Sequence, residues 1–322
     1  MPTIVVLGEA LFDLFADTGI RLQDAENLRR MPGGAPANVA VALARLGADV
    51  GFIGKVGTDG FGSFLIDLLT REGVDTSWFS ADPSAPTMLA LVAAPSPTTQ
   101  DFVLYNGANA LLSPEGLPYE YISGARVFVY GSVTMASESR AAAMTAARWA
   151  RDAGQHVVFD VNLRPALWPD LDEARLCIQE SVALANIIKL NETELEFLTD
   201  IQDPDKGSER LLEYDVDLCC VSLGAKGAYL NNGTIKGHVP AYSVKVCDTT
   251  GSGDAFVAGL ALQLQNLDQP LTDIEESVLC RMLTFANACG GLAATQLGAM
   301  SAAPTLGAVE ELLRADPAWK GT

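Results

Sequence analysis

Short apolar runs rich in valine and isoleucine alternate along the chain with longer stretches of helical periodicity. The apolar runs cover residues 3–7, 49–53, 126–130, 156–161, 186–190 and 218–222. The helical patterns include residues 61–72, 139–153, 172–184 and 254–266. Repeated strand–helix units place their strands in one sheet with helices packed over it. The alternation therefore predicts an α/β fold with a central, mostly parallel sheet flanked by helices.

Two segments interrupt this alternation. Residues 87–93 and 101–105 are strand-like and are joined by the turn-rich sequence APSPTTQ, and residues 14–31 have no clean helical period. We expect a small β excursion, formed within about 14–31 and 86–110, that covers a site or a partner subunit. Because the chain has no linker and no internal repeat, its 322 residues are consistent with one domain over 1–322.

The charge balance and the cysteine spacing disfavour several classes of protein. Lys and Arg total 21 against 40 Asp and Glu, so the formal net charge of -19 would repel a nucleic acid. The six cysteines have no CxxC spacing and only two histidines accompany them, which disfavours a zinc site, a disulfide framework and a nucleophile–histidine triad. The sequence has no signal-peptide pattern and no membrane-spanning apolar run. We expect a cytoplasmic protein that binds neither nucleic acid nor membrane.

Polar residues directly follow four of the predicted strands. They are Gly8, Glu9 and Asp13; Asp160, Asn162 and Arg164; Asn191, Glu192 and Glu194; and Ser222 and Gly224. In open α/β sheets ligands bind outside the carboxyl ends of the strands, so these distant residues are expected to converge on one cleft. Ordinary capping and loop polarity explain any one of them, but that alternative makes Arg164 and the Asn/Glu cluster coincidental.

The sequence MPGGAPANVAVALARLG, residues 31–47, predicts a buried helix that begins after two glycines. Apolar residues occupy nearly every face, so Asn38 is buried with the helix and its amide needs hydrogen-bond partners. From this motif alone, a structural role for Asn38 is as reasonable as a ligand contact. Gly33 and Gly34 favour the ligand contact, because a backbone without side chains approaches a small polar ligand closely.

A second glycine-rich turn, DTTGSGD, precedes a helical pattern whose apolar spacing predicts one buried face. Gly251, Ser252 and Gly253 would present N–H groups at the positive end of the helix dipole, where an anion binds. An aspartate would repel that anion, so Asp254 is better explained as a base for a hydroxyl that attacks the anion's phosphorus. The alternative is that Asp254 only stabilises the first helical turn, which leaves the flanking glycines unexplained.

Two common nucleotide-binding motifs do not fit the sequence. The only Gly-Lys pair, Gly54-Lys55, is followed by Val56 and lacks the upstream glycine of a P-loop. GSGDAF has Phe256 where the dinucleotide-binding fingerprint needs its third glycine. A P-loop is excluded, and a nicotinamide-dependent oxidoreductase stays a second-choice hypothesis.

The sequences GGAPANVAVALARLG, GFIGKVGTDGFG and DTTGSGDAFVAGL resemble the two signatures of the PfkB, or ribokinase-like, carbohydrate kinases. FDVNLRPALW, KLNETELEFL, VSLGAKGAYL and FANACGGLAATQLGAM occur in the family's order, so the resemblance covers nearly the whole chain. Within the family these stretches are most like those of fructokinases. The resemblance implies a ribokinase-like fold in which the β excursion is a lid that covers the sugar and builds a homodimer.

The resemblance also implies roles for the residues around the transferred phosphoryl group. Asp254 would deprotonate the sugar hydroxymethyl, and Gly251, Ser252 and Gly253 would form the anion hole. Arg164 would hold the phosphates as a planar cation. The sugar hydroxyls would be bound by Asp13, Gly33, Gly34 and Asn38.

Nucleotide and metal sites follow from the same resemblance. The ATP site would be lined by Asn191, Ser222, Gly224, Lys226, Gly227, Gly253 and Asn287. Asn191 and Glu194, in the family's NxxE pattern, would organise Mg²⁺ through its waters. A monovalent cation, K⁺, would be bound by Asp248, Thr250, Ala293, Gln296, Gly298 and Ala302.

These inferences predict an ATP-dependent phosphotransferase that converts fructose to fructose 6-phosphate. Aminoimidazole riboside is the nearest alternative substrate, because DVNLR and FANACG also occur in the related riboside kinases; ribose and 2-keto-3-deoxygluconate are others. Ser252 departs from the family pattern, in which alanine is usual. A hypothesis of another class is a catalytically silent scaffold, which the presence of Asp254, Arg164 and the Asn191–Glu194 pair disfavours.

Overall fold

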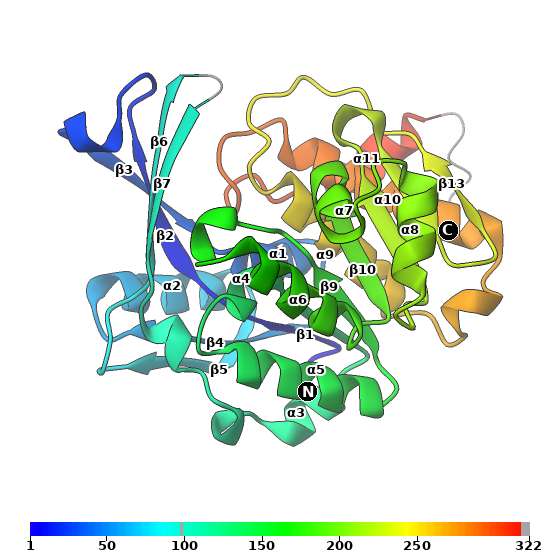
Figure 1. Ribbon diagram of the computed structural model, residues 1–322, viewed down its shortest axis with the longest axis horizontal. Helices are drawn as coiled ribbons and strands as arrows, with labels where there is room; N and C mark the ends of the chain where they lie inside the picture. The colour runs from blue at the N-terminus through cyan, green and yellow to red at the C-terminus, as the bar shows by residue number, and fades with distance from the viewer. Residues whose placement is uncertain (97–98, 317–322) are drawn as a thin grey trace.

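The computed structural model describes residues 1–96 and 99–316. Within these residues the central sheet has nine strands in the order β13-β12-β11-β10-β9-β8-β1-β4-β5 (Figure 1). The strands are β1 (Ile4–Leu7), β4 (Val50–Gly57), β5 (Asp75–Asp82), β8 (Val127–Gly131), β9 (His156–Asp160), β10 (Ile187–Asn191), β11 (Leu218–Ser222), β12 (Ala228–Asn231) and β13 (Lys236–Val239). All neighbours from β5 to β11 pair in parallel, and β12 and β13 add an antiparallel edge. The predicted mostly parallel α/β sheet is confirmed.

Helices cover both faces of this sheet (Figure 1). They are α1 (Ala35–Arg45), α2 (Gly60–Arg71), α3 (Tyr119–Ser123), α4 (Ser132–Met135), α5 (Arg140–Asp152), α6 (Leu171–Val182), α7 (Glu192–Thr199), α8 (Pro204–Leu212), α9 (Ser252–Leu264), α10 (Glu276–Ala293) and α11 (Leu306–Arg314). Short 3-10 helices occur at Leu22–Asp24, Ala108–Leu111, Pro114–Gly116, Pro165–Leu167, Gly224–Lys226 and Leu271–Asp273.

Side chains of the central strands alternate between two apolar layers, because successive residues of a strand point to opposite faces. In β1, Ile4 and Val6 pack in the layer that contains α1, α2, α9, α10 and α11. Val5 and Leu7 pack in the opposite layer with α3, α5, α6, α7 and α8. Burial on both faces explains why the strand sequences are apolar throughout.

Helix α9 is buried on nearly every side, whereas its sequence spacing predicted a single buried face. Residues 255–262 and Leu264 are all buried, because α9 packs against both α1 and α10. At Gly259 a Cβ atom would lie 2.9 Å from the Cys289 sulfur of α10, so the two helices approach closely there. Helix α10, which the periodicity did not reveal, is the partner that buries the second face. The predicted burial of the helix after Gly34 is confirmed in α1.

The two segments that interrupt the alternation form a second sheet that projects from the body (Figure 1). Its strands are β2 (Leu11–Ala16), β3 (Leu28–Gly33), β6 (Leu89–Ser96) and β7 (Thr99–Tyr105), in the order β3-β2-β6-β7. Leu11, Met88 and Ala90 form a small apolar cluster at its base. The first strand of this sheet follows β1 almost directly, so the sheet stands at the carboxyl end of a central strand. Asp13, which lies on β2, is carried by this sheet rather than by the body.

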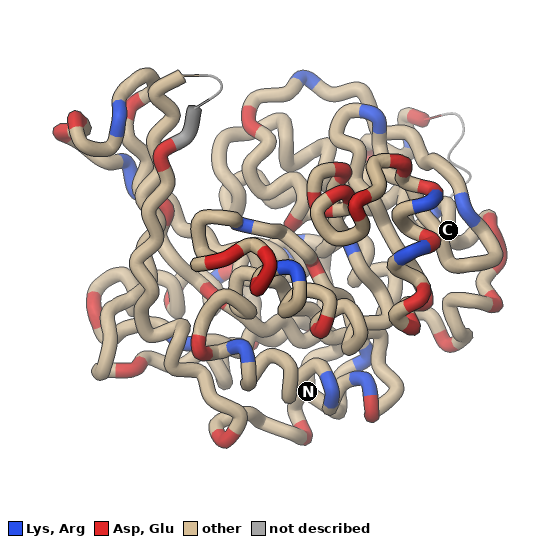
Figure 2. The backbone as a smooth tube through the Cα atoms, in the orientation of Figure 1, with Lys and Arg blue, Asp and Glu red and all other residues tan. Residues whose placement is uncertain are grey.

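Acidic residues are distributed along the backbone over the body and the far end of the small sheet (Figure 2). Basic residues are interspersed with them and form no continuous face in this view (Figure 2). Within the part of the chain that the structure describes, no helix is long and apolar enough to cross a membrane.

Candidate active site

The N-terminal ends of α9 and α1 meet through a hydrogen bond between two residues that are distant in sequence. Asn38 Nδ2 donates to Asp254 Oδ2 over 2.7 Å, and both helices pack against each other behind this contact. The sequence left open whether Asn38 is structural, and the structure shows that one function of its amide is to hold Asp254. The Asn38 Oδ1 atom is buried and has no hydrogen-bond partner among the described residues. That oxygen is available to accept a hydrogen bond from a ligand hydroxyl.

The Asp254 carboxylate is in an environment that suits a base. Burial and the neighbouring Asp160 carboxylate raise the pKa of Asp254 to about 6. The hydrogen bond from Asn38 and the cations Lys189 and Arg164 act in the opposite direction. Such a carboxylate is deprotonated at neutral pH, yet it accepts a proton more readily than an ordinary aspartate does.

The N-terminal turn of α9 uses its glycines for close packing. Gly251 has a φ of 78°, and a Cβ atom there would lie 2.7 Å from the Cα atom of Ala299. The N-cap residue of α9 is Gly251, and Asp254 lies in the first turn of the helix, where its negative charge also interacts favourably with the helix dipole. The Ser252 hydroxyl is buried and has no partner among the described residues. The Ser252 N–H donates to the Thr249 carbonyl over 3.2 Å, so among the described residues the N–H groups of Gly251 and Gly253 are the ones left at the positive helix end for an anion.

Asp13, Gly33 and Gly34 lie together beside Asp254. A Cβ atom at Gly33 would lie 2.2 Å from the Asp13 carboxylate, and one at Gly34 would lie 2.5 Å from the Glu9 carbonyl oxygen. Gly34, which has a φ of 99° and meets backbone atoms, is thus required by the packing of the protein itself, whereas at Gly33 the nearest atoms belong to the movable Asp13 side chain. Burial raises the pKa of Asp13 to about 6, although the positive charge of Arg164 opposes this effect.

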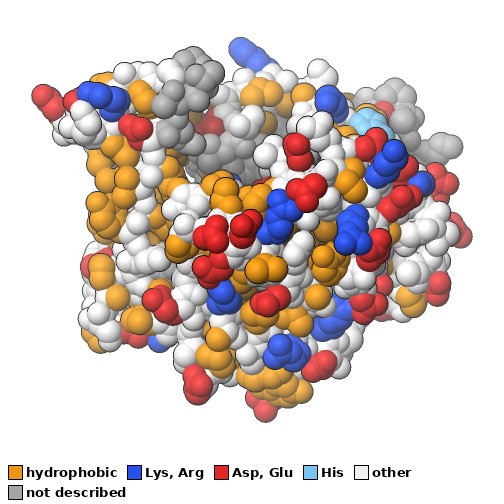
Figure 3. Space-filling model, in the orientation of Figure 1, with side chains coloured by type: hydrophobic (Ala, Val, Ile, Leu, Met, Phe, Trp, Pro, Cys, Tyr) orange, Lys and Arg blue, Asp and Glu red, His pale blue; other side chains and the backbone are white. Residues whose placement is uncertain are grey.

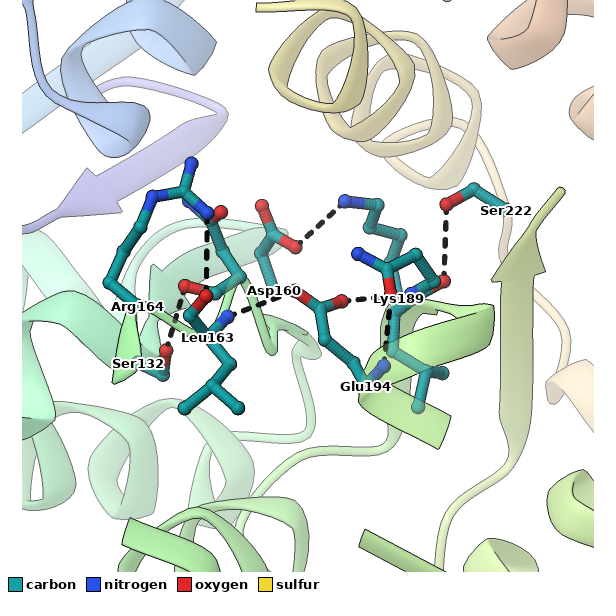
Figure 4. A network of polar contacts seen from close by, with 10 residues as sticks. Ser132, Asp160, Leu163, Arg164, Lys189, Glu194 and Ser222 are labelled. Carbon is teal, nitrogen blue, oxygen red and sulfur yellow. Dashed lines mark hydrogen bonds and ion pairs between the residues drawn. The ribbon is translucent and has the colours of Figure 1, made fainter. Parts of the chain in front are cut away.

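Arg164 lies near both aspartates but is exposed. Its guanidinium lowers the pKa of Asp13 and of Asp254, which shows that the three groups interact electrostatically. Its hydrogen bond within the chain is a long one of 3.4 Å to the Leu163 carbonyl (Figure 4). The preceding Asn162 has an unusual φ of 27°, which turns the chain out of β9. Arg164 is therefore free to move onto an anion in the cleft.

A buried ion pair lies beneath the N-terminus of α9, and the sequence reasoning missed half of it. Lys189 on β10 and Asp160 on β9 are adjacent across the parallel pairing, with 3.1 Å between Nζ and Oδ1 (Figure 4). Both side chains are 7% exposed. A lysine inside the apolar run IIKLN was the available signal, because lysine is almost never fully buried without a partner.

Asn191 and Glu194 form a capping box at the start of α7. The Asn191 side chain accepts from the Glu194 N–H, and Glu194 Oε2 accepts from the Asn191 N–H over 2.8 Å. Glu194 Oε1 also accepts from the Leu163 N–H over 2.9 Å, which ties the loop after β9 to α7 (Figure 4). Each carboxylate oxygen keeps a second lone pair for a water molecule. The pair thus fits Mg²⁺ held through water, and the described residues contain no cluster of acidic, histidine or cysteine side chains that fits direct coordination.

The predicted nucleotide-binding residues occupy one edge of the carboxyl ends of the strands. Ser222 ends β11 and donates to the Leu190 carbonyl, and Lys226 is an exposed neighbour of Glu192. At Gly227, with a φ of 110°, a Cβ atom would lie 2.1 Å from the Val239 carbonyl oxygen. On α10, Asn287 donates to the carbonyls of residues 239 and 240. These bonds join the end of β11 to β10 and the end of β13 to α10, and Gly224 after β11 has a left-handed φ of 57°.

The predicted monovalent-cation residues are brought together by backbone contacts. Asp248 Oδ2 accepts from the Gly298 N–H over 2.8 Å, and Asp248 Oδ1 accepts from the N–H and hydroxyl of Thr250. The Ala294 carbonyl accepts from Cys247 and Asp248, which holds the segment 293–302 against the turn before α9. That segment contains Ala293, Gln296, Gly298 and Ala302. An acidic side chain beside loop carbonyls is a donor set that fits a monovalent cation.

The fold, with a buried carboxylate at the N-terminus of α9, is that of an α/β phosphotransferase. The model of the pfkB family of carbohydrate kinases matches residues 1–306. The chain therefore belongs to this family and is a sugar kinase. The predicted family, the ribokinase-like fold and the phosphotransferase activity are confirmed.

Known relatives of this chain include fructokinases. Probable fructokinase-6, chloroplastic, of Arabidopsis thaliana is 41% identical over 318 residues, which are 97% of this chain and 82% of the relative. Fructokinase from Xylella fastidiosa, solved with bound ATP, superposes with a TM-score of 0.89 at 33% identity, covering 98% of this chain and 99% of that one. A double mutant of fructokinase from Vibrio cholerae O395, solved with fructose, ADP and a potassium ion, superposes with a TM-score of 0.86 at 34% identity. The match covers 97% of this chain and 98% of that one.

Proposed function

We propose that this sugar kinase phosphorylates D-fructose to fructose 6-phosphate, with ATP as the phosphoryl donor and Asp254 as the base. The observation that carries the proposal is the hydrogen bond from Asn38 to Asp254, which fixes a carboxylate beside the anion site of α9. The fructokinase structures with bound ATP, and with fructose, ADP and potassium, support this choice of substrates.

In this mechanism the sugar hydroxymethyl lies against Asp254 and gives its proton to the carboxylate as its oxygen attacks the γ-phosphorus. The new oxygen–phosphorus bond forms while the bond to the bridging oxygen breaks, and ADP leaves with that electron pair. The N–H groups of residues 251–253 stabilise the charge on the transferred group. Asn191 and Glu194 would hold Mg²⁺ through water, and the ion would supply positive charge to the phosphate oxygens.

The sugar is held from the side opposite to ATP. Asp13 and the free Oδ1 of Asn38 accept hydrogen bonds from sugar hydroxyls, and the small sheet covers the sugar. Arg164 contacts the phosphates, because it is exposed and already faces the two aspartates. Asp248 and the segment 293–302 would hold K⁺, which would supply positive charge beside the turn that leads into α9.

The test is ADP release over a panel of fructose, ribose, glucose, 2-keto-3-deoxygluconate, adenosine and aminoimidazole riboside, with Mg²⁺ and with either K⁺ or Na⁺. We expect fructose to give the highest kcat/KM and Asp254→Asn to lower kcat by at least about 10³-fold while ATP still binds. Asp67→Asn, an exposed aspartate on α2, is the matched control and should be unaffected. A different preferred sugar would replace the substrate, and normal turnover by Asp254→Asn would remove the base. Folded wild-type protein without sugar-dependent ADP release would favour a scaffold.

We further propose that the small sheet forms a homodimer. Its Leu28, Val103 and Tyr105 side chains are 39%, 41% and 58% exposed, and hydrophobic side chains gather over this sheet on the face seen in Figure 3. Analytical ultracentrifugation should give a dimer for the wild type and a monomer for Val103→Asp. A monomeric wild type at micromolar concentration would contradict this proposal.

A further inference from the structure

Lys189 points towards the N-terminus of α9 from the sheet side. In β10 the neighbours Ile188 and Leu190 pack in the layer of α5 and α6, so Lys189 projects from the opposite face, on which α9 lies. A Cβ atom at Gly253 would lie 2.9 Å from Lys189 Nζ. The ammonium group is therefore directly adjacent to the turn that forms the anion site.

The ammonium group has more donors than partners. A lysine carries three N–H donors, and the described residues give Lys189 one hydrogen bond, to Asp160 Oδ1 (Figure 4). The side chain is 7% exposed, so water does not freely satisfy the other two donors. A buried donor without a partner is costly, and a ligand oxygen beside Gly253 would satisfy it.

Mutual neutralisation with Asp160 is the simpler explanation of the pair. It accounts for the burial of both charges, but it does not account for the position of the ammonium against Gly253. A buried ion pair also contributes little to stability compared with an apolar pair of the same size. A ligand that carries negative charge explains the position and the unused donors together.

We propose that Lys189 is a catalytic residue that binds the transferring phosphoryl group from the sheet side. This proposal rests on the proposed kinase function of the same site. The N–H groups of residues 251–253 contact the group from the helix side, and Lys189 contacts it from below, next to Gly253. The lysine keeps all its protons during the reaction, while the hydroxyl proton goes to Asp254. Because an ammonium group on a flexible stem acts as a point charge, it can follow the phosphorus as it moves from ADP to the sugar oxygen.

Asp160 is a positioning residue in this arrangement. It anchors the ammonium through one donor, because the pairing of β9 with β10 places the two residues side by side.

The experiment compares the binding of AMP-PNP and of ADP by titration calorimetry, without sugar, in the full-length protein with Mg²⁺. We expect Lys189→Met to weaken AMP-PNP binding by roughly 10-fold or more relative to ADP, and to lower kcat by about 10²–10³-fold. Lys55→Met is the matched control, because Lys55 pairs with Asp82 over the same 3.1 Å outside the site and is not expected to change the AMP-PNP to ADP ratio.

The double variant Asp160→Asn/Lys189→Met separates the two explanations. It removes both charges of the pair together, and with Asp160 it removes a negative charge that repels Glu194 and Asp254, so it is expected to fold even if Lys189→Met alone does not. If the double variant prefers AMP-PNP as the wild type does and regains turnover, the pair serves only mutual neutralisation and the proposal is wrong. If the preference for AMP-PNP stays lost, the phosphoryl contact is supported. A wild type with normal nucleotide binding but no sugar-dependent turnover would contradict the proposed function and leave this test intact.

Discussion

Replacement of Gly251 by alanine tests how tightly the proposed anion site is built. Gly251 has a φ of 78°, in the left-handed region, where an alanine costs roughly 1–2 kcal/mol. Its new Cβ atom would also lie 2.7 Å from both the Cα and the Cβ atoms of Ala299. Contacts this short require a shift of backbone on one side, either in the turn before α9 or in the segment 293–302.

Gly154→Ala is the matched control for the backbone strain. Gly154 has a similar φ of 75°, but a Cβ atom there has open space around it. Both variants should lose roughly 1–2 kcal/mol in urea unfolding, and Gly251→Ala somewhat more. Only Gly251→Ala should lower kcat, by about 10²-fold or more, because a displaced N–H group no longer meets the transferred phosphoryl group.

The assay is steady-state ADP release at saturating sugar and ATP, together with the urea midpoint of each variant. If Gly251→Ala keeps the wild-type kcat, the N–H groups of this turn are not placed to the accuracy that the mechanism requires. If Gly154→Ala lowers kcat equally, the loss is a general effect of instability and the contact with Ala299 does not explain it.

Three further predictions concern the ionisable groups. The pKa of Asp254 is raised to about 6 and the base must be charged, so kcat/KM should fall as the pH drops through about 6. A flat profile of kcat/KM between pH 5 and 7 would contradict the assignment of Asp254 as the base. Asn38→Ala removes a hydrogen bond that favours charged Asp254, so the acid limb should move to higher pH and the sugar KM should rise. Burial raises the pKa of Glu9 from 4.5 to about 7, so the folded state binds the extra proton in this range and wild-type stability falls as the pH rises through it. Glu9→Gln, which preserves the contact with Thr134, should therefore gain stability relative to the wild type between pH 5 and 8 in urea unfolding; a constant difference would refute this.

Much of the framework could be predicted from the sequence because its causes are local. Strands buried on both faces are apolar throughout, so β1, β8 and β9 were visible as runs, and the glycine turns before α1 and α9 marked two helix starts. The polar residues after these strands were expected in one cleft because parallel strands end at the same edge. Asp254 was recognised as a candidate base from its turn alone.

The contacts that make a site from these residues depend on tertiary structure. Asn38 and Asp254 are 216 residues apart in sequence. Only the packing of α1 on α9 brings the Asn38 amide within hydrogen-bond distance of the Asp254 carboxylate. Lys189 appeared as one residue in an apolar run until the pairing of β9 with β10 placed it beside Asp160 and beneath Gly253. Local sequence determines which elements form, because propensity and burial pattern act over a few residues. Which side chains meet, and what their pKa values become, is decided by long-range packing, because charge and burial act across the whole fold.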